Sequence, residues 1–198
     1  MSAMNIDELA ETTRRRLASR NRRVVAPGSL VPAAVLVLII DRDEPYLVFA
    51  KRTERVGHHK GQISFPGGIM GGADASLLDT ALRECEEEIG LPPTAVEPLG
   101  ALDDTETVAT QFVITPFVAR VREAVAWQPD GEEIEKVIEV PWAALNARGA
   151  IRVKMWERDG VRRPVYFFDY QGETIWGATA RILKQYLDLM AGPGEATP

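Results

Sequence analysis

The stretch that decides the fold runs from Phe65 to Leu91 and reads FPGGIMGGADASLLDTALRECEEEIGL. Its first part is rich in glycine, and its second part has the apolar periodicity of a helix, which we expect over Ala75 to Ile89. Gly90, followed by Pro92 and Pro93, is a typical helix stop signal. The stretch therefore predicts a turn-rich loop that leads into an amphipathic helix.

Carboxylates gather on one side of this expected helix. At about 3.6 residues per turn, Glu84, Glu87 and Glu88 fall on one arc, while Cys85 falls on the apolar arc as a buried structural thiol. Like charges at this spacing repel, and the C-terminal end of a helix disfavours negative charge further. Arg83 can pair with Glu87, but one guanidinium does not neutralise the patch. A hard divalent cation, Mg²⁺ or Mn²⁺, would compensate for it; the alternative is a solvated acidic face.

The glycines before the helix suit a loop that approaches a ligand. Gly67 and Gly68, with Gly71 and Gly72 after them, allow the backbone to come close to a bound group. Such a loop can offer N–H groups to a phosphate of the substrate or a carbonyl oxygen to a metal. A glycine-rich turn alone is weak evidence of a binding site. Here the carboxylates that follow on the helix strengthen that interpretation.

Composition limits the kinds of partner and of site. The chain has 198 residues, with 23 Lys and Arg against 29 Asp and Glu, so its formal net charge is −6. This acidic excess argues against nucleic acid or an anionic membrane as a partner. The single cysteine, Cys85, and the adjacent His58 and His59 exclude a disulfide framework and a cysteine- or histidine-based metal cage. Any metal must therefore bind mainly to oxygen.

The remaining periodicity predicts one mixed α/β unit. Strands are expected at 33–40, 46–50, 112–121, 137–140 and 165–170. The first two strands indicate a hairpin, and a last helix over 176–190 either closes the core or serves a homodimer. The most apolar stretch, 30–40, is too short to span a bilayer, and the first residues lack a secretory signal. A soluble, cytoplasmic protein is expected.

The first part of the chain is expected to be a helical, arginine-rich extension over 1–29, before a main domain over 30–191 and a frayed tail over 192–198. Residues 5–23 have a helix-forming composition and contain Arg14, Arg15, Arg16, Arg20, Arg22 and Arg23. Such a run usually forms a solvated helix face, and the alternative is contact with phosphate or nucleic acid. Asp103, Asp104 and Glu106 likewise predict an exposed acidic loop.

The region of the helix resembles the signature of the Nudix hydrolases. The matching residues are Gly68, Asp74, Arg83, Glu84, Cys85, Glu86, Glu87, Glu88, Ile89, Gly90 and Leu91. The second half matches at every defined position. In the first half, Asp74 stands where Glu is usual, and the segment from Gly68 to Arg83 is one residue longer than usual.

The longer segment resembles the coenzyme A pyrophosphatase-like branch of this family. Three further stretches agree with that branch, at 58–68, 113–116 and 175–183. The upstream motif of the branch expects an arginine at the position of Gly57, although Arg55 is close enough to substitute for it. The resemblance covers roughly residues 30 to 190.

The resemblance implies a Nudix-fold α/β/α sandwich with a mixed β-sheet, and a pyrophosphatase that depends on Mg²⁺ or Mn²⁺. Glu84 and Glu88 are then the first metal ligands, with Glu87 next and the carbonyl oxygen of Gly68 as a possible additional ligand. Arg83 orients Glu87 or a neighbouring carboxylate. Glu133 matches an acidic position that serves as general base or distal ligand, and the alternative there is an exposed acidic loop.

The same resemblance implies coenzyme A or its thioesters as substrate, with 3′-phosphoadenosine 5′-phosphate and a 4′-phosphopantetheine compound as products. The basic stretch from Lys51 to Lys60 is where a phosphorylated small molecule would bind, through Arg52, Arg55 and Lys60. The alternative there is a charged strand end. Two other functions stay open: hydrolysis of another nucleoside diphosphate derivative, such as NADH, ADP-ribose or a sugar nucleotide, and a non-catalytic module that senses a nucleotide.

Overall fold

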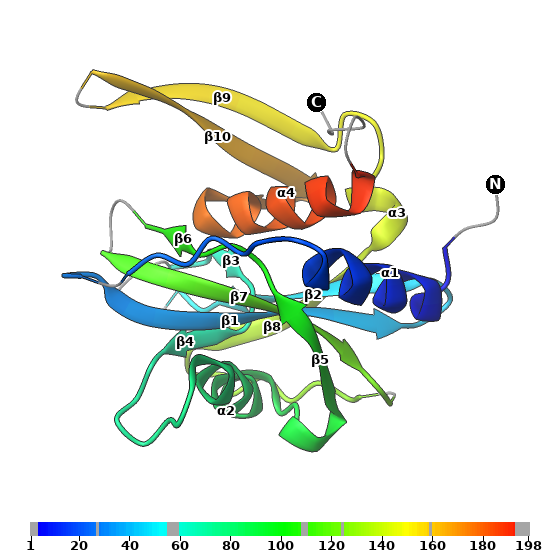
Figure 1. Ribbon diagram of the computed structural model, residues 1–198. Coiled ribbons are helices and arrows are strands. Elements are labelled where there is room, and N and C mark those ends of the chain that lie inside the picture. The colour runs from blue at the N-terminus through cyan, green and yellow to red at the C-terminus, as the bar shows by residue number, and fades with distance from the viewer. Residues whose placement is uncertain are drawn as a thin grey trace.

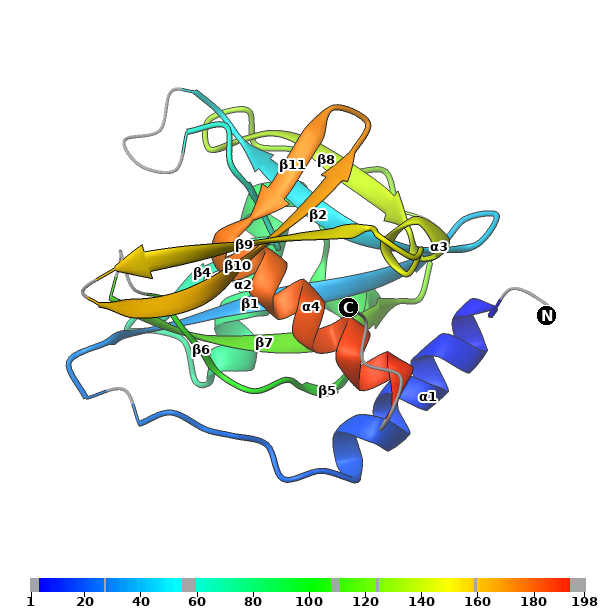
Figure 2. The same ribbon diagram turned by 90° about the horizontal axis from the view of Figure 1, so that it is seen from above.

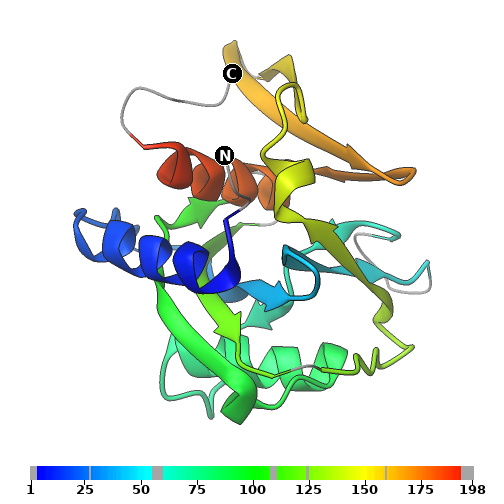
Figure 3. The same ribbon diagram turned by 90° about the vertical axis from the view of Figure 1, so that its right-hand side faces the viewer.

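A mixed β-sheet forms the centre of the molecule, with helices on both faces. The computed structural model describes residues 4–26, 28–54, 60–107, 111–123, 125–158 and 160–192. Helix α2 (Leu77–Ile89) covers one face of the sheet, and helices α1 (Ile6–Ala18) and α4 (Gly177–Ala191) cover the other (Figures 1 and 3). This arrangement confirms the expected α/β/α sandwich.

Strand β1 (Val31–Asp41) is the centre of the sheet. It pairs antiparallel with β2 (Pro45–Arg52) and parallel with β7 (Phe112–Val121). Because β1 carries an unbroken apolar run, its side chains are buried on both faces, as a central strand requires. The hairpin and the strand at 112–121 were both predicted from this periodicity.

Shorter strands complete the main sheet. They are β3 (Ile63–Ser64), β4 (Gly67–Ile69), β5 (Val96–Ala101), β6 (Thr105–Glu106) and β8 (Ile134–Pro141). Strand β4 pairs with the start of β1, and β8 pairs with β2. A 3₁₀ turn, η1 (Pro93–Ala95), precedes β5, and the short helix α3 (Trp142–Leu145) follows β8. The glycine-rich loop, which contains β4, thus lies against the start of β1.

Helix α2 begins two residues later than predicted and ends where predicted. The side chain of Ser76 caps its first turn by accepting a hydrogen bond from the backbone N–H of Asp79. Gly90 ends it in the left-handed region, with φ 70°. Ala81, Cys85 and Ile89 are fully buried against the sheet. The opposite arc is left for the carboxylates.

A second, three-stranded sheet lies beyond α4. It contains β9 (Ile151–Arg158), β10 (Val161–Tyr170) and β11 (Glu173–Trp176), with β10 in the middle. Seen from above, these strands lie over α4 (Figure 2). Helix α4 is therefore held between two sheets, and its apolar side chains Ile182, Leu183, Tyr186 and Leu187 are buried. Of the two roles predicted for this helix, closing the core is the one the structure confirms.

The two ends of the described chain meet on one face of the main sheet. The Thr13 hydroxyl of α1 lies 2.7 Å from the Tyr186 hydroxyl of α4. Arg16 donates a hydrogen bond to the Leu189 carbonyl oxygen at 2.6 Å. Ile6 and Leu9 of α1 are buried in the same apolar cluster as the sheet. The chain before residue 30 thus packs into the common core.

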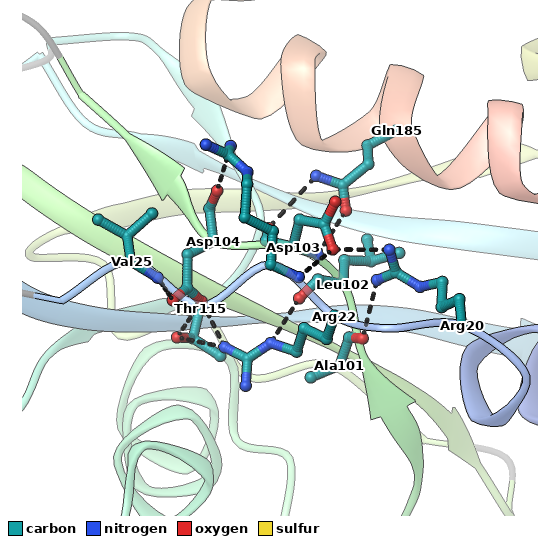
Figure 4. Close-up of polar contacts among 10 residues, drawn as sticks. Arg20, Arg22, Val25, Ala101, Leu102, Asp103, Asp104, Thr115 and Gln185 are labelled. Atoms are coloured by element: carbon teal, nitrogen blue, oxygen red, sulfur yellow. Dashed lines mark hydrogen bonds and ion pairs between the residues drawn. The ribbon is translucent and has the colours of Figure 1, made fainter.

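The arginine run and the acidic loop bind each other, which corrects two expectations. The helix ends at Ala18, and Arg20 and Arg22 lie in the extended segment after it. Arg20 pairs with Asp103 at 2.7 Å, and Arg22 pairs with the buried Asp104 (Figure 4). A solvated arginine face and an exposed acidic loop were expected; both are wrong at these four residues because each charged set covers the other.

No helix within the described ranges is long and apolar enough to cross a membrane.

Candidate functional site

Two glycines bring the loop against both the sheet and the helix. At Gly67, where φ is 142°, a Cβ atom would lie 2.2 Å from the carbonyl oxygen of Ala34 on β1. At Gly68, a Cβ atom would lie 2.4 Å from the carboxyl carbon of Glu84. Any side chain at either position would therefore push β4 away from β1 or push the Glu84 carboxylate out of place. Glycine here allows close approach of the backbone to β1 and to the Glu84 carboxylate, whereas its approach to a bound ligand stays a prediction.

Glu88 is a buried carboxylate at the same place. The residue is 6% exposed, and its Oε2 accepts a hydrogen bond from the backbone N–H of Gly67 at 3.0 Å. Burial, and to a smaller extent the nearby charge of Glu84, raise the pKa of Glu88 to about 7, against the lowering effect of the Gly67 N–H. Burial is also the main cause that raises the pKa of Glu84. Both carboxylates thus lie where burial disfavours their charged form.

Arg83 connects the loop to the helix. Its Nε and one terminal nitrogen bind the Asp74 carboxylate at 2.9 and 3.1 Å. The same guanidinium reaches Glu84 at 2.8 Å and Glu87 at 2.9 Å. Through these contacts it holds the pKa of Asp74 well below its usual value. The pairing with Glu87 was expected from the spacing, and a contact with a neighbouring carboxylate such as Glu84 from the family resemblance, whereas the contact with Asp74 was not expected.

Asp74 is itself held by the loop and the first turns of α2. It accepts hydrogen bonds from the Gly71 backbone N–H at 2.7 Å and from the Thr80 hydroxyl at 2.9 Å. The side chain is 5% exposed. Asp74, which stands where the signature usually has Glu, therefore has hydrogen-bond partners for both of its carboxylate oxygens.

Glu133 and Arg52 lie together beside these carboxylates. The Arg52 guanidinium is 2.9 Å from the Glu133 carboxylate. The charge of Glu133 raises the pKa of both Glu84 and Glu88, and the charge of Arg52 lowers that of Glu88, so all four groups share one electrostatic environment. The sequence singled out both residues but gave no sign that they pair.

The loop that carries Glu133 is fixed by its own backbone. The carboxylate of Asp130 accepts hydrogen bonds from the N–H groups of Glu132, Glu133 and Ile134. The Thr53 hydroxyl, just after β2, donates to the Glu132 carbonyl oxygen at 2.8 Å. Glu133, whose side chain is 57% exposed, is thereby placed at the end of β2 rather than on a free loop.

The other basic residues of the stretch from Lys51 to Lys60 differ in their surroundings. Lys51 binds Glu173 of β11 at 2.9 Å, and Lys136 binds the same carboxylate. Lys60 is exposed. Arg55, with Gly57, His58 and His59, lies outside the described residues. Of the three basic residues predicted to bind substrate, Arg52 is the one that the structure places beside the carboxylates.

The carboxylates fit a divalent cation only in part as they stand. Within the described ranges, no three His, Cys, Asp or Glu side chains are grouped as they would be around a bound ion. Arg83 accounts for this, because it binds both Glu84 and Glu87. Glu84 and Glu88 nevertheless fit a hard cation by their chemistry, since they are adjacent carboxylate oxygen ligands whose pKa values are raised mainly by burial.

Comparison with known proteins places this site in a family. The NUDIX domain model matches residues 30–162, which include β4, α2 and the Glu133 loop. The chain belongs to the Nudix family. It is 36% identical over 153 residues to an uncharacterized Nudix hydrolase, NudL, from Salmonella paratyphi B, across 77% of this chain and 79% of that protein. The protein is thus a Nudix hydrolase, as the signature implied.

Solved structures agree with this Nudix fold. A NUDIX hydrolase from Alicyclobacillus acidocaldarius matches with a TM-score of 0.50 and 20% identity, over 60% of this chain and 82% of that one. A MutT/nudix family protein from Enterococcus faecalis matches with a TM-score of 0.50 and 16% identity, over 88% of this chain and 66% of that one. At this identity the likeness concerns the fold alone.

Proposed function

We propose that this Nudix hydrolase is a divalent-metal-dependent pyrophosphatase that cleaves the diphosphate of coenzyme A or its thioesters. The observation that carries the hydrolytic part is the buried Glu88, held at the Gly67 backbone beside Glu84 with too little positive charge around it. The choice of coenzyme A rests on the sequence stretches that resemble that branch of the family.

The proposed roles follow from the position of each group. Glu84 and Glu88 would hold Mg²⁺ or Mn²⁺, with the Gly68 carbonyl oxygen and Glu87 as further ligands. When bound, such an ion neutralises the diphosphate and lowers the pKa of a bound water. Arg83 positions the carboxylates, because it already ties Glu84 and Glu87 to Asp74.

Glu133 is the proposed general base. It would accept a proton from the attacking water, while the water oxygen bonds to one phosphorus and the bridging P–O bond breaks. Its carboxylate is exposed and near Glu84 and Glu88, as a base acting on substrate at that place must be. In the structure it is bound to Arg52, so that pair opens when Glu133 acts.

Arg52 is the proposed phosphate contact. Its side chain is 24% exposed, and its Nε is buried with no hydrogen-bond partner among the described residues. An arginine fork with a donor left over matches two oxygens of a phosphate. Arg55 and Lys60 remain proposed contacts to the rest of the substrate, and Gly67 and Gly68 to the diphosphate through their backbone.

Two alternatives are separated by the same experiment. Gly57, in place of the arginine expected in the branch, favours another nucleoside diphosphate derivative such as NADH, ADP-ribose or a sugar nucleotide. A nucleotide sensor without catalysis is the second alternative. The complete set of Glu84, Glu87 and Glu88 supports an enzyme, because a sensor has no need of so repulsive a patch.

The test is a substrate panel. The protein is incubated with Mg²⁺ or Mn²⁺ and with coenzyme A, acetyl-coenzyme A, NADH, ADP-ribose, a sugar nucleotide or a diadenosine polyphosphate, and the products are separated by chromatography. We expect 3′-phosphoadenosine 5′-phosphate and 4′-phosphopantetheine from coenzyme A, and no product when a chelator is present. Cleavage of another compound with coenzyme A intact would overturn the substrate; binding without any cleavage would support the sensor.

A further inference from the structure

The second sheet ends in an open edge strand. β9 pairs with β10 on one side, and within the described part of the chain no strand pairs with its other side. In Figure 1, β9 is the outer strand of the hairpin, on the far side of β10 from α4. An edge of this kind presents unpaired N–H and C=O groups to any strand that can approach. β9 is therefore free to pair.

Pro164 determines which backbone groups point to this edge. It lies opposite Met155 in the β9–β10 ladder. Because proline has no N–H, the two residues form a non-hydrogen-bonded pair, and the backbone groups of Met155 point away from β10. Since the ladder alternates with a period of two, Val153 and Glu157 present their backbone groups to the same open edge.

Large apolar side chains are exposed on both faces of this strand. Val153 is 46% exposed and Met155 is 52% exposed on one face. On the other face Trp156 is 53% exposed, with its ring 6.5 Å from that of Trp176. A partner that docked on one face would leave the other face in water. A strand added in the plane of the sheet gives the side chains of both faces a neighbour.

We propose that the partner is a second copy of this chain, whose β9 pairs antiparallel with β9 about a twofold axis at Met155. An antiparallel edge is complementary to itself under such a rotation. At this register Lys154, whose ammonium lies 5.6 Å from the ring centroid of Phe167 in its own chain, is opposite Trp156 of the second copy, and Val153 is opposite Glu157. The two copies then form one continuous six-stranded sheet, three strands from each.

Charge disfavours two other registers. An axis at Lys154 would set two ammonium groups opposite each other, and an axis at Glu157 would set two carboxylates opposite each other. With the axis at Met155, no two charged residues of like sign lie opposite each other between positions 153 and 157. The dimer is independent of the proposed hydrolysis, because β9 contributes no group to the carboxylate site.

The mass of the protein in solution tests the pairing. Light scattering after size exclusion should give about twice the chain mass of 21.8 kDa for the wild type. Met155→Pro should give the single-chain mass, because it removes an N–H that points outward and takes no part in the β9–β10 ladder. Met155→Thr is the matched control; it keeps the N–H and should remain a dimer. Circular dichroism checks that each variant is folded.

Cysteine cross-linking tests the register and needs no disruptive variant. In the proposed pair, the two Met155 Cα atoms lie about 5.5 Å apart, within disulfide reach, so Met155→Cys should form a disulfide-linked dimer on mild oxidation. Two copies of Val153→Cys should not, because their positions are about 13 Å apart along the strands. The native Cys85 is buried and does not compete.

Either measurement can overturn the proposal. A wild-type mass of one chain at every concentration excludes the dimer. A Met155→Pro variant that folds and stays dimeric excludes β9 as the interface, and a failure of Met155→Cys to cross-link while Val153→Cys does so excludes the register. If Met155→Pro does not fold, the cysteine pair alone decides.

Discussion

Glu88 and Asp104 are both buried carboxylates, yet their surroundings are opposite. Asp104, 2% exposed, is bound by the Arg22 guanidinium, by the Thr115 hydroxyl at 2.7 Å and by the Val25 backbone N–H at 2.8 Å. Glu88, 6% exposed, accepts one hydrogen bond from a backbone N–H, and the charges of two other carboxylates near it outnumber that of Arg52. A carboxylate whose charge the protein satisfies holds the fold together. A buried carboxylate whose charge the protein does not compensate is suited to bind a cation.

The largest expected effect is on catalysis, from Glu88→Gln. The substitution keeps the shape but removes the charge that would hold the metal, so we expect kcat to fall by about 10³-fold, or about 4 kcal/mol of barrier. Steady-state rates with the cleaved substrate and saturating Mg²⁺ measure this. Glu86→Gln, on the exposed side of the same helix, is the matched control and should keep its rate. Unchanged turnover in Glu88→Gln would show that the Glu88 charge is not needed for catalysis, and so would contradict the contrast with Asp104.

The second effect is a pH dependence of stability in the metal-free protein. The pKa of Glu88, about 7 when folded, lies above its ordinary value of 4.5, so the folded protein keeps a proton that the unfolded chain releases. Stability therefore falls as pH rises from about 4.5 to about 7, by about 3 kcal/mol in total.

Urea unfolding in the presence of a chelator measures this change. Glu88→Gln is the reference, because it lacks the titrating group while other groups titrate alike. As pH rises, the unfolding free energy of the wild type should fall relative to that of Glu88→Gln. A difference that is flat across this range would contradict the assigned environment of Glu88.

A third, smaller effect concerns Asp104. Asp104→Asn keeps an acceptor for the Val25 N–H but leaves Arg22 without its counter-charge, so the free energy of unfolding should fall by about 2 kcal/mol. Chemical denaturation measures the loss, and kcat at a temperature where the variant is folded should match wild type. A variant that loses activity while it remains fully stable would show that Asp104 belongs to the reaction.

The smallest effect comes from Arg22→Lys. Lysine keeps the positive charge, but it cannot reproduce the set of contacts in which the guanidinium binds Asp104, the Thr115 hydroxyl and the Leu102 carbonyl oxygen. We expect a loss of about 1 kcal/mol in unfolding free energy. A loss as large as that of Asp104→Asn would mean that geometry, rather than charge, dominates this buried pair.

The sites of Glu88 and Asp104 also show what local sequence can predict. The arc of Glu84, Glu87 and Glu88 follows from helical spacing, and the core strands follow from their apolar runs, because both signals lie within a few residues. The pairing of Arg22 with Asp104 spans 82 residues and leaves no local pattern. Each half of the pair therefore looked like a solvated charge when taken alone.

Other parts of the fold were missed for similar reasons. β9 alternates apolar with charged residues only from Ile151 to Met155, where the apolar Trp156 interrupts the pattern, and it lies outside the main core, so it was missed. β5 contains Pro98 and Gly100, which weaken any strand signal. In the site, the bond between Arg52 and Glu133 depends on how the loop after Asp130 docks beside β2, which periodicity does not describe.

The contact between Thr13 and Tyr186 has a consequence for synthesis on the ribosome. Helix α1 packs on β5 and on α4, and Tyr186 of α4 is separated from Thr13 by 173 residues, so α1 emerges long before the surface that covers it is complete. During that interval Ile6 and Leu9 are exposed to water and to other nascent chains. Contacts between such distant segments also slow folding. A chain truncated before Gly177 would lack the part of this face that α4 provides, including the Tyr186 hydroxyl that Thr13 contacts.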